Sequence, residues 1–339
     1  MELGIGMFGD LRYDNQINGY RSAQTKIGEI LEQVQLMDEV GLDVFAMGEH
    51  HRPDYAVSSP EMLLAAAASR TKNIKLASGV TVLSSAEPVK VYEDFSTLDL
   101  ISSGRAEIFV GRGSFIESFP LYGYSLDDYE TLFEEKLDLL LKINSEENVS
   151  WKGSLRAPML NQTVYPRATN NGKLPIWIAV GGTPQSVYRA AVLGLPLIVA
   201  IIGGMPSQFV KLIEFYKQEY LKAGHPEELM QIAIHSHTFV SEDPKVIDGY
   251  FESYKAQMDR IGSSRGWAPY TKMQFEGGRS EEGALFIGSA NEVADKINKV
   301  KELFGLTRFI GHMDVGDPEH DIQMKSIELF GDQVASQVR

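Results

Sequence analysis

Leu42–Pro53, with the sequence LDVFAMGEHHRP, is the segment from which the fold of this chain is best approached. Its apolar part, Asp43–Met47, is bounded by glycines, which is typical of a short buried strand. Glu49, His50 and His51 follow directly. In parallel α/β proteins the loops after the strands hold the chemistry, and histidine exchanges protons near neutral pH. The cluster therefore predicts a functional site, with a helix cap or a polar niche as the structural alternative.

The order of strand, loop and helix repeats outward from this segment along the whole chain. Apolar runs predict strands at 3–8, 43–47, 74–82, 106–110, 176–180, 197–202, 231–240 and 308–313. Helical spacing of apolar residues separates them, as in 27–41, 60–71, 88–101 and 244–261. Eight right-handed βα units close most naturally into a barrel. We therefore predict the α/β class and a (β/α)8 TIM barrel, with an open doubly wound sheet as the alternative.

Two polar stretches interrupt this alternation without forming separate domains. Residues 144–172, after the fourth helix, are rich in turn formers and predict a hairpin over the barrel. Residues 262–283, after the seventh strand, contain several glycines and charges and predict an irregular, lid-like loop. We expect a single domain over residues 1–339 with these two insertions.

Composition excludes several classes of protein. The chain has 339 residues, of which 43% are hydrophobic and 23% charged, as in an ordinary soluble domain. A net charge of −14 argues against nucleic acids and anionic membranes as partners. The absence of cysteine removes disulfides, thiolate catalysis and cysteine-ligated metals. No apolar run approaches the length of a membrane span, and the first residues are too acidic for a signal peptide, so we expect a cytoplasmic protein.

Glycines gather at the predicted mouths of the strands, where backbone N–H groups and a helix N-terminus can bind an anion. An arginine between two glycines could supply a fixed charge. The residues that we expect to bind a phosphate-bearing cofactor are Arg112, Gly181, Gly182, Thr183, Gly203 and Gly204. The alternative is that these glycines only form tight turns, since neither GxGxxG nor a Walker motif is present.

His235 and His237 lie two residues apart on a predicted strand, so both project from the same face. If that face points inward, they line the interior of the barrel. Together with His50, His51 and Asp314 they could also bind a metal ion. A metal-dependent barrel hydrolase therefore stays open at this point, beside a structural pair of hydrogen-bonded core histidines.

Several motifs resemble those of the bacterial luciferase-like flavin monooxygenases. They are GEHHRPD at 48–54, GVTVLSSAEPVKVYEDF at 79–95, SGRAEIFVGRG at 103–113, PIWIAVGGTPQSV at 175–187, GLPLIVAIIGG at 194–204, IHSHTFV at 234–240 and IELFGDQVA at 327–335. The likeness covers almost the whole chain, and the motifs are specific as a set. Two departures, Gly111 in place of a reactive cysteine and Gly182 in place of a glutamate, separate the chain from the light-emitting members.

The resemblance implies a barrel with FMN at its C-terminal mouth. It makes His50 the catalytic residue with Glu49 orienting it, and Gly79–Val80 a non-prolyl cis peptide behind the flavin ring. It places the flavin phosphate at Arg112 and at Gly181–Thr183. It also implies a mobile lid at 262–283 and a homodimer formed through the helices after strands two and three.

The resemblance further implies a two-component enzyme. Such an enzyme takes reduced FMN from a separate flavin reductase and transfers one oxygen atom of molecular oxygen to a small organic substrate. We assign His51, His235 and His237 to the substrate pocket and expect no metal. The alternatives are a deazaflavin (F420)-dependent oxidoreductase, a non-catalytic flavin-binding protein and the metal-dependent hydrolase.

Overall fold

The computed structural model describes residues 1–113 and 115–339, and its centre is a ring of parallel strands. Within these ranges the ring consists of β1 (Glu2–Met7), β4 (Val44–Met47), β5 (Lys75–Ser78), β7 (Ala106–Gly111), β10 (Ile176–Val180), β11 (Leu197–Ala200), β12 (Ile232–Val240) and β14 (Arg308–His312). The parallel pairing of β10 with β7, with Ile178 opposite Val110, closes it. The predicted barrel is confirmed, and the open doubly wound sheet is wrong.

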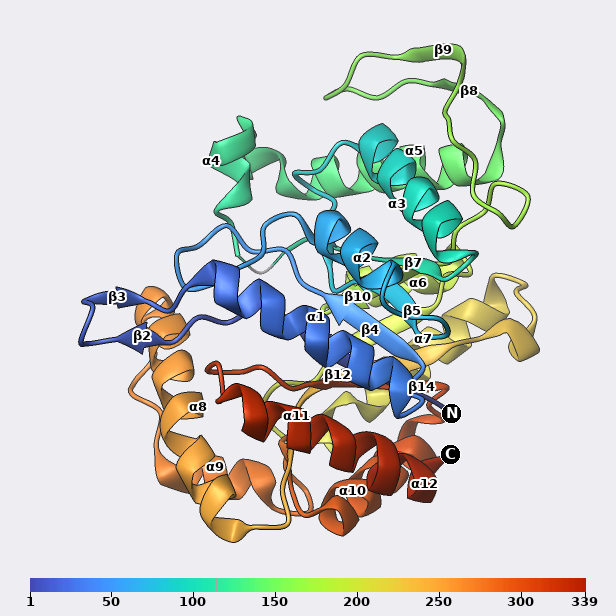
Figure 1. Cartoon of the computed structure of the whole chain (residues 1–339). Helices are drawn as coiled ribbons and strands as arrows, with labels where there is room; N and C mark the ends of the chain where they lie inside the picture. Colours follow the sequence, from blue (N-terminus) through green and yellow to red (C-terminus); the bar gives the residue numbers. More distant parts are fainter. Residues whose placement is uncertain (114) are drawn as a thin grey trace.

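Helices surround this barrel, and the carboxyl ends of the strands point to the left in Figure 1. The long helices are α1 (Ala23–Glu39), α2 (Pro60–Ala68), α3 (Pro88–Ser102), α5 (Tyr129–Ser145), α6 (Pro184–Val192), α7 (Val210–Lys222), α8 (Pro244–Arg265), α10 (Ala290–Phe304) and α11 (His320–Leu329). Local sequence explains several starts. Proline stands in the first turn of α2, α3, α6 and α8, where its missing N–H costs no hydrogen bond. Ser289 and Glu292 form a capping box on α10.

Short elements complete the chain. They are the hairpin β2 (Tyr13–Asp14) and β3 (Gly19–Tyr20), β6 (Thr81–Val82), α4 (Ser118–Tyr122), the hairpin β8 (Asn148–Trp151) and β9 (Met159–Thr163), α9 (Lys272–Arg279), β13 (Phe286–Gly288) and α12 (Ala335–Val338). Among the described helices, none combines the length and the apolarity needed to cross a bilayer. The two termini lie close together at the right of Figure 1, on the side away from the carboxyl ends of the strands.

The amino end of the barrel is filled by a buried ionic group. The guanidinium of Arg308 donates to Glu107 Oε2 at 2.6 Å and to Glu2 Oε2 at 2.7 Å, and it lies 4.2 Å from the ring of Trp177. Arg308 is only 1% exposed. Breaking such a buried pair by removing one partner costs about 3–5 kcal/mol. This packing leaves the carboxyl end as the end where a ligand can enter.

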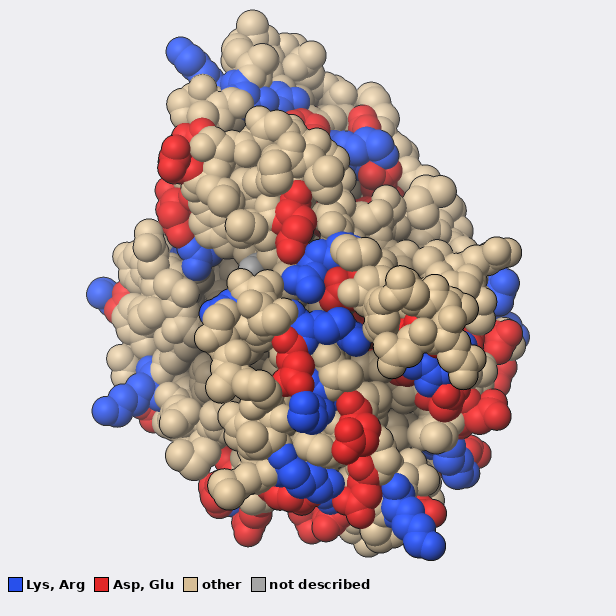
Figure 2. Space-filling view, turned by 90° about the vertical axis from the view of Figure 1, so that its left-hand side faces the viewer, with Lys and Arg blue, Asp and Glu red and all other residues tan. Residues whose placement is uncertain are grey.

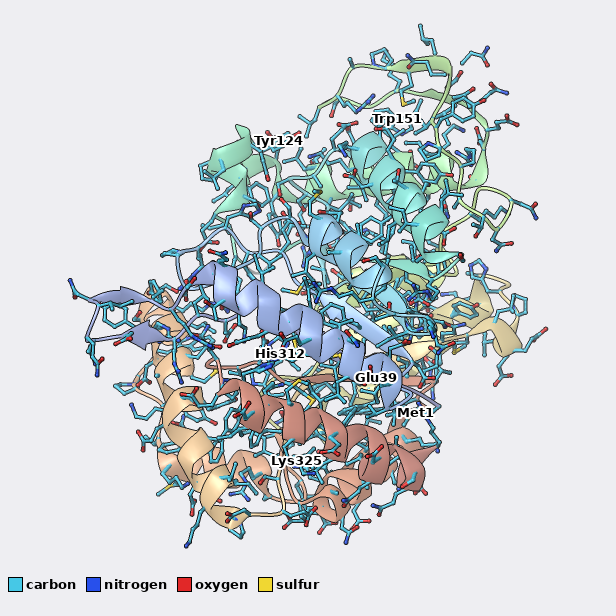
Figure 3. All side chains as sticks on the ribbon, in the orientation of Figure 1. Met1, Glu39, Tyr124, Trp151, His312 and Lys325 are labelled. Carbon is cyan, nitrogen blue, oxygen red and sulfur yellow. The ribbon has the colours of Figure 1, made fainter. Side chains whose placement is uncertain are left out.

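The two insertions differ in part from their predicted form. The hairpin in 144–172 is present, but it lies against α5, where Trp151 Nε1 donates to Asp138 Oδ2 at 2.7 Å. Figure 3 shows Trp151 on this outer side, away from His312 in the barrel interior. The expectation that the hairpin lies over the barrel is therefore corrected. Its Trp151 and Met159 are apolar side chains that need a helix surface to cover them.

The segment 262–283 is mainly helical, so the predicted irregular loop is wrong. Helix α8 continues to Arg265, ends at Gly266 with φ +70°, and is followed by α9. Thr271 and Gln274 cap α9 reciprocally, and the buried Phe275 anchors it. The glycines and charges of this stretch obscured its helical pattern. Likewise, the predicted strand 74–82 is two short strands, β5 and β6, separated by Gly79 and Val80.

Candidate active site

A cavity of about 1100 Å³ opens at the carboxyl ends of the barrel strands. Figure 2 shows the side of the molecule to which these ends point; it is hollowed, and basic and acidic side chains are mixed over it. Residues from all parts of the ring line the cavity, among them Phe8, Asp10, Glu49, His50, Tyr55, Gly79, Val80, Arg112, Gly181, Thr183, Gly203, Gly204, His235, His237, His312 and residues of the 254–285 region. Most of the predicted site residues therefore meet in one place.

His50 lies in this cavity inside a cage of aromatic rings. Its imidazole stacks on Tyr55 at 4.2 Å between centroids and contacts Phe8 at 4.5 Å and Phe115 at 5.0 Å. It is 8% exposed, and neither ring nitrogen has a hydrogen-bond partner in the described protein. Burial, with smaller effects from Arg52 and His51, lowers the pKa of His50 to about 3. The imidazole is therefore neutral at pH 7, with both nitrogens left for a ligand.

Glu49 does not orient His50, which corrects the expectation. Its Oε1 lies 2.9 Å from His51 Nε2, and its Oε2 accepts the backbone N–H of Val82 at 3.0 Å. Residues two apart in an extended segment point to the same side and their neighbour to the other, which explains the pairing. His51 is not among the lining residues; it contacts Tyr122 with 5.5 Å between ring centroids. Glu49, which lines the cavity, thus links His51 to the backbone of β6.

Gly79 and Val80 form part of the cavity wall, and the peptide bond between them is cis. The non-prolyl cis peptide that the resemblance implies at this position is therefore present. Gly111 on the neighbouring strand leaves room for it, because a Cβ at Gly111 would lie 2.8 Å from Val80 Cγ2. That steric requirement accounts for glycine at position 111.

The predicted phosphate-binding residues come together where β7 and β10 end. Arg112 Nη2 lies 3.4 Å from Thr183 Oγ1, and the guanidinium is 5.4 Å from the ring of Tyr129. Thr183 is the N-cap of α6, yet its side chain makes no capping hydrogen bond. Arg112 also forms an ion pair with Glu130. A guanidinium, a hydroxyl and a helix start therefore converge, with a carboxylate already in contact with the arginine.

Not all glycines of the predicted anion site lie on the cavity wall. Gly181, Gly203 and Gly204 line the cavity, but Gly182 does not. Gly182 has φ +119°, a backbone conformation that favours glycine. Its place in the sequence is thus explained by the turn between β10 and α6.

Three histidines meet on the wall formed by β12 and β14. His235 Nε2 lies 3.2 Å from His312 Nδ1, and His237 Nδ1 lies 2.8 Å from Tyr254 Oη. Gly6 makes room for them, because a Cβ there would lie 2.6 Å from His235 Nε2. Burial lowers the pKa of His235 to about 4, and burial together with His235 lowers that of His237 to about 3. These side chains are neutral polar groups at pH 7.

His312 belongs to this cluster, although sequence analysis did not assign it to the site. It pairs in register with His237 across the two strands, and it lines the cavity. His312 lies two residues after Ile310 on the last strand, so the two side chains point to the same face. This strand periodicity could have identified His312 as a residue of the barrel interior. Within 1–113 and 115–339, no group of three or more histidine or acidic side chains is arranged to hold a metal ion.

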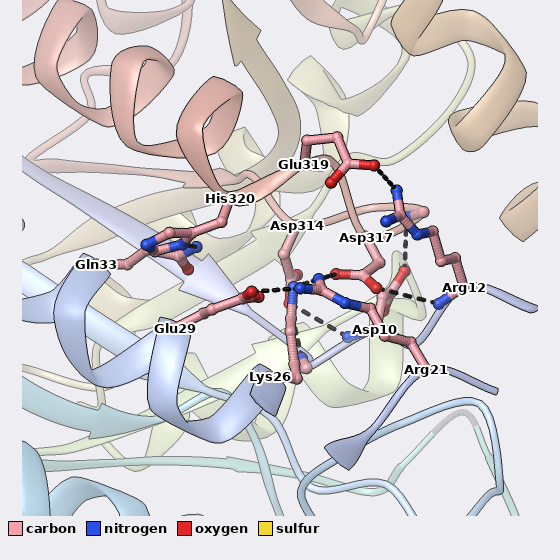
Figure 4. A network of polar contacts seen from close by, with 12 residues as sticks. Asp10, Arg12, Arg21, Lys26, Glu29, Gln33, Asp314, Asp317, Glu319 and His320 are labelled. Carbon is pink, nitrogen blue, oxygen red and sulfur yellow. Dashed lines mark hydrogen bonds and ion pairs between the residues drawn. The ribbon is translucent and has the colours of Figure 1, made fainter. Parts of the chain in front are cut away.

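A buried ionic network fixes the loop after β1 (Figure 4). Asp314 accepts the backbone N–H groups of Phe8, Gly9 and Asp10 at 3.0, 2.7 and 3.3 Å. Lys26, 1% exposed, lies 4.0 Å from Asp314 Oδ2 and donates to Asp317 at 2.9 Å. Because Phe8 contacts both His50 and His312, this network positions one side of the cavity. Sequence analysis missed Lys26, since a lysine on a helix is usually exposed.

Comparison with known proteins gives a family match over most of the chain. The family model described as luciferase-like monooxygenase matches residues 11–308. The structure is similar to monooxygenase RslO1 from Streptomyces bottropensis, with a TM-score of 0.85, 22% identity and 100% of both chains covered.

Two further solved structures share the fold. One is the oxygenating constituent of 3,6-diketocamphane monooxygenase from Pseudomonas putida in complex with FMN, with a TM-score of 0.76, 22% identity, and 100% of this chain and 99% of that chain covered. The other is the coenzyme F420-dependent tetrahydromethanopterin reductase from Methanopyrus kandleri, with a TM-score of 0.75, 18% identity and the same coverage. At these identities the likeness concerns the fold.

Proposed function

The chain belongs to the luciferase-like monooxygenase family, and from this premise we propose that it is an oxidoreductase that uses reduced FMN and molecular oxygen to oxygenate a small organic substrate. One observation carries the proposal. A single cavity joins an anion-binding corner at Arg112 and Thr183 to a buried neutral histidine, His50, whose ring nitrogens have no hydrogen-bond partner among the described residues.

The residues present fit FMN. Its phosphate matches the corner of Arg112, Thr183 and the N-terminus of α6, where Glu130 now contacts the arginine and would give way to the phosphate. Its flat ring matches the wall at Gly79 and Val80, which presents backbone and a small apolar side chain. We further assign Gly181, Gly203 and Gly204 to the cofactor's surroundings.

Reduced flavin, when bound, supplies the electrons that activate molecular oxygen. The chain's own residues position the reactants and manage protons. His50, neutral and held by Phe8, Tyr55 and Phe115, accepts or donates a proton at a ring nitrogen. The rings around it exclude water, which protects reactive species from hydrolysis.

Glu49 and the other histidines have supporting roles in this proposal. Glu49 is a positioning residue that ties His51 to the backbone of Val82. His235 and His237 offer neutral hydrogen-bonding groups to the substrate from the wall of β12. His51, outside the lining, acts through Glu49.

A separate flavin reductase and a second copy of the chain are the partners that we propose. A cytoplasmic location, where a reductase and its electron donor are available, goes with this proposal. Met62 on α2 and Leu100 and Ile101 on α3 are 75%, 48% and 53% exposed, and they support a dimer through these two helices. Sedimentation should give a dimer for wild type and a monomer for Ile101→Lys; a monomeric wild type would contradict this interface.

Replacement of His50 tests the function. With reduced FMN regenerated by an added reductase, wild type should convert an accepted substrate to an oxygenated product, and His50→Ala should lose at least about 100-fold in turnover. Reduced FMN should bind within about threefold of wild type, because His50 does not contact the phosphate corner. His51→Ala is the matched control and should lose less than His50→Ala. An unchanged turnover for His50→Ala would remove its assigned role.

A further inference from the structure

The cavity is large enough for a second molecule beside a flavin. Its volume of about 1100 Å³ exceeds the roughly 300–1,000 Å³ of most single-ligand pockets. The corner of Arg112 and Thr183 belongs to β7 and β10, which are neighbours in the ring. The strands opposite them are β14 and β1. A flavin anchored at Arg112 therefore leaves the space over β14, β1 and β4.

Helix α8 covers that space. Gln257 Nε2, from α8, donates to Tyr55 Oη, from the loop after β4, at 3.0 Å. The loop after β14 also touches α8, because a Cβ at Gly316 would lie 2.3 Å from the carbonyl oxygen of Ser253. We name this space the α8 compartment. It is bounded by Asp10, Tyr55, Phe115, Gln257, Met258 and Trp267, which all line the cavity.

The aromatic side chains on the walls of the α8 compartment form two sets of ring contacts. Phe115 packs against His50 and Tyr55, and the guanidinium of Arg265 lies 5.2 Å from the Phe115 ring and 5.3 Å from the Trp267 ring. This set runs from the catalytic histidine to the rim, where Trp267 is 52% exposed.

The second set comes from β12, from α8 and from the segment between α8 and α9. Tyr254 contacts His237 at 5.5 Å and Tyr270 at 5.4 Å between ring centroids. All three line the cavity. Ring faces and edges on two sides are suited to a flat aromatic guest, which they contact by offset stacking or edge to face. A flexible aliphatic chain would gain burial here but not these ring contacts.

The α8 compartment presents little fixed charge to a guest. The carboxyl of Asp10 is 2% exposed, and burial together with Asp314 raises its pKa well above the usual value, which favours its neutral form. The cation Arg265 faces aromatic rings. We propose that the α8 compartment binds an uncharged aromatic substrate of at least two fused rings, with Trp267 and Tyr270 as specificity-determining residues; this rests on the proposed function of the same cavity.

The test is direct binding of three probes to the full chain by calorimetry. The probes are 1-naphthol, decanal with the same number of carbon and oxygen atoms, and the anion 1-naphthoate. We expect 1-naphthol to bind at least about tenfold more tightly than the other two. Tyr270→Leu and Trp267→Leu should each weaken the binding of 1-naphthol at least about threefold and leave the binding of decanal unchanged. Tyr188→Leu, a tyrosine on the outside of α6, is the control and should change neither.

Equal or tighter binding of decanal or 1-naphthoate, or no binding of 1-naphthol, would overturn the proposal. So would unchanged 1-naphthol binding in both variants. Reduced FMN binding is measured on the same samples. Loss of 1-naphthol binding with FMN binding intact contradicts only the aromatic compartment. Failure of FMN binding while 1-naphthol binds as expected contradicts the proposed function instead.

Discussion

The imidazole of His50 lies stacked on the ring of Tyr55, with 4.2 Å between the centroids and 24° between the ring planes. Within residues 1–113 and 115–339, neither nitrogen of His50 has a hydrogen-bond partner, and three aromatic rings pack around its imidazole. Tyr55 is itself held by Gln257, 202 residues further along the chain. Helix α8 and a catalytic candidate are thereby joined through one tyrosine.

Replacements at Tyr55 should separate the contribution of its ring from the contribution of its hydroxyl. Tyr55→Phe keeps the ring stack but leaves the buried Gln257 amide without its acceptor. The free energy of unfolding should therefore fall by about 1–3 kcal/mol, while kcat stays within about threefold of wild type. Tyr55→Leu removes the stack, and kcat should fall at least about tenfold through loss of His50 alignment. Urea unfolding and steady-state kinetics measure both effects. Equal kcat in the two variants would show that the ring does not position His50.

Arg112 should distinguish flavins by their phosphate. Arg112→Gln removes the fixed charge of the anion corner, so binding of reduced FMN should weaken at least about tenfold. Riboflavin lacks the phosphate, and its binding should change less than about twofold. Arg156→Gln, an arginine paired with Glu87 near the β8–β9 hairpin, serves as the control. If the binding of reduced FMN and the binding of riboflavin weaken equally, the phosphate does not bind at Arg112.

Glu130 should compete with the cofactor. Its carboxylate pairs with Arg112, and it is about half exposed, so it can move away. Glu130→Gln removes this competing negative charge and should tighten reduced FMN binding by about three- to tenfold at low salt. The gain should shrink as ionic strength rises. Weaker FMN binding in this variant would mean that Glu130 supports the site rather than competing for it.

The buried histidines should make the folded state sensitive to acid. The pKa of His237 falls to about 3 in the folded state from an ordinary value near 6.5, so below pH 6.5 the unfolded chain takes up a proton that the folded chain does not. Stability is therefore lost as the pH falls, by about 1.4 kcal/mol per pH unit for this histidine.

Urea unfolding of wild type and His237→Asn at pH 7, 6 and 5 tests this sensitivity. The variant should be less stable at pH 7 but should lose about 2 kcal/mol less than wild type between pH 7 and pH 5. The comparison with wild type cancels the opposite effect of buried carboxyls such as Asp10, whose raised pKa favours the folded state in acid. Parallel pH curves for the two proteins would contradict a neutral, buried His237.

Much of the architecture could be predicted from the sequence, because it depends on local patterns. Apolar runs identified the barrel strands, and residues that follow a strand, such as His50 and Arg112, or lie on one, such as His235, do line one cavity. Strand periodicity also brought His235 and His237 to the same wall. The cis peptide at Gly79–Val80 came from the family resemblance, since nothing in local propensity indicates it.

The remaining features depend on contacts between distant segments. The partner of Glu49 is decided by which side of the chain each side chain faces, and sequence adjacency to His50 was misleading there. Lys26 is buried because Asp314 and Asp317, almost 300 residues away, neutralise it. Helix α9 was missed because it is only eight residues long and contains Gly277 and Gly278, while the contacts that stabilise it, its capping box and the packing of Phe275, do not show in a helical repeat of apolar residues.

Anaerobic titration of the purified chain with reduced FMN, and in parallel with reduced F420, tests the proposed use of FMN. Calorimetry gives the stoichiometry and both dissociation constants. We predict one reduced FMN bound per chain with a dissociation constant in the micromolar range or below, and at least about tenfold weaker binding of F420. Equal or tighter binding of F420 would contradict the assignment of FMN, and no binding of either would contradict the cavity as a flavin site.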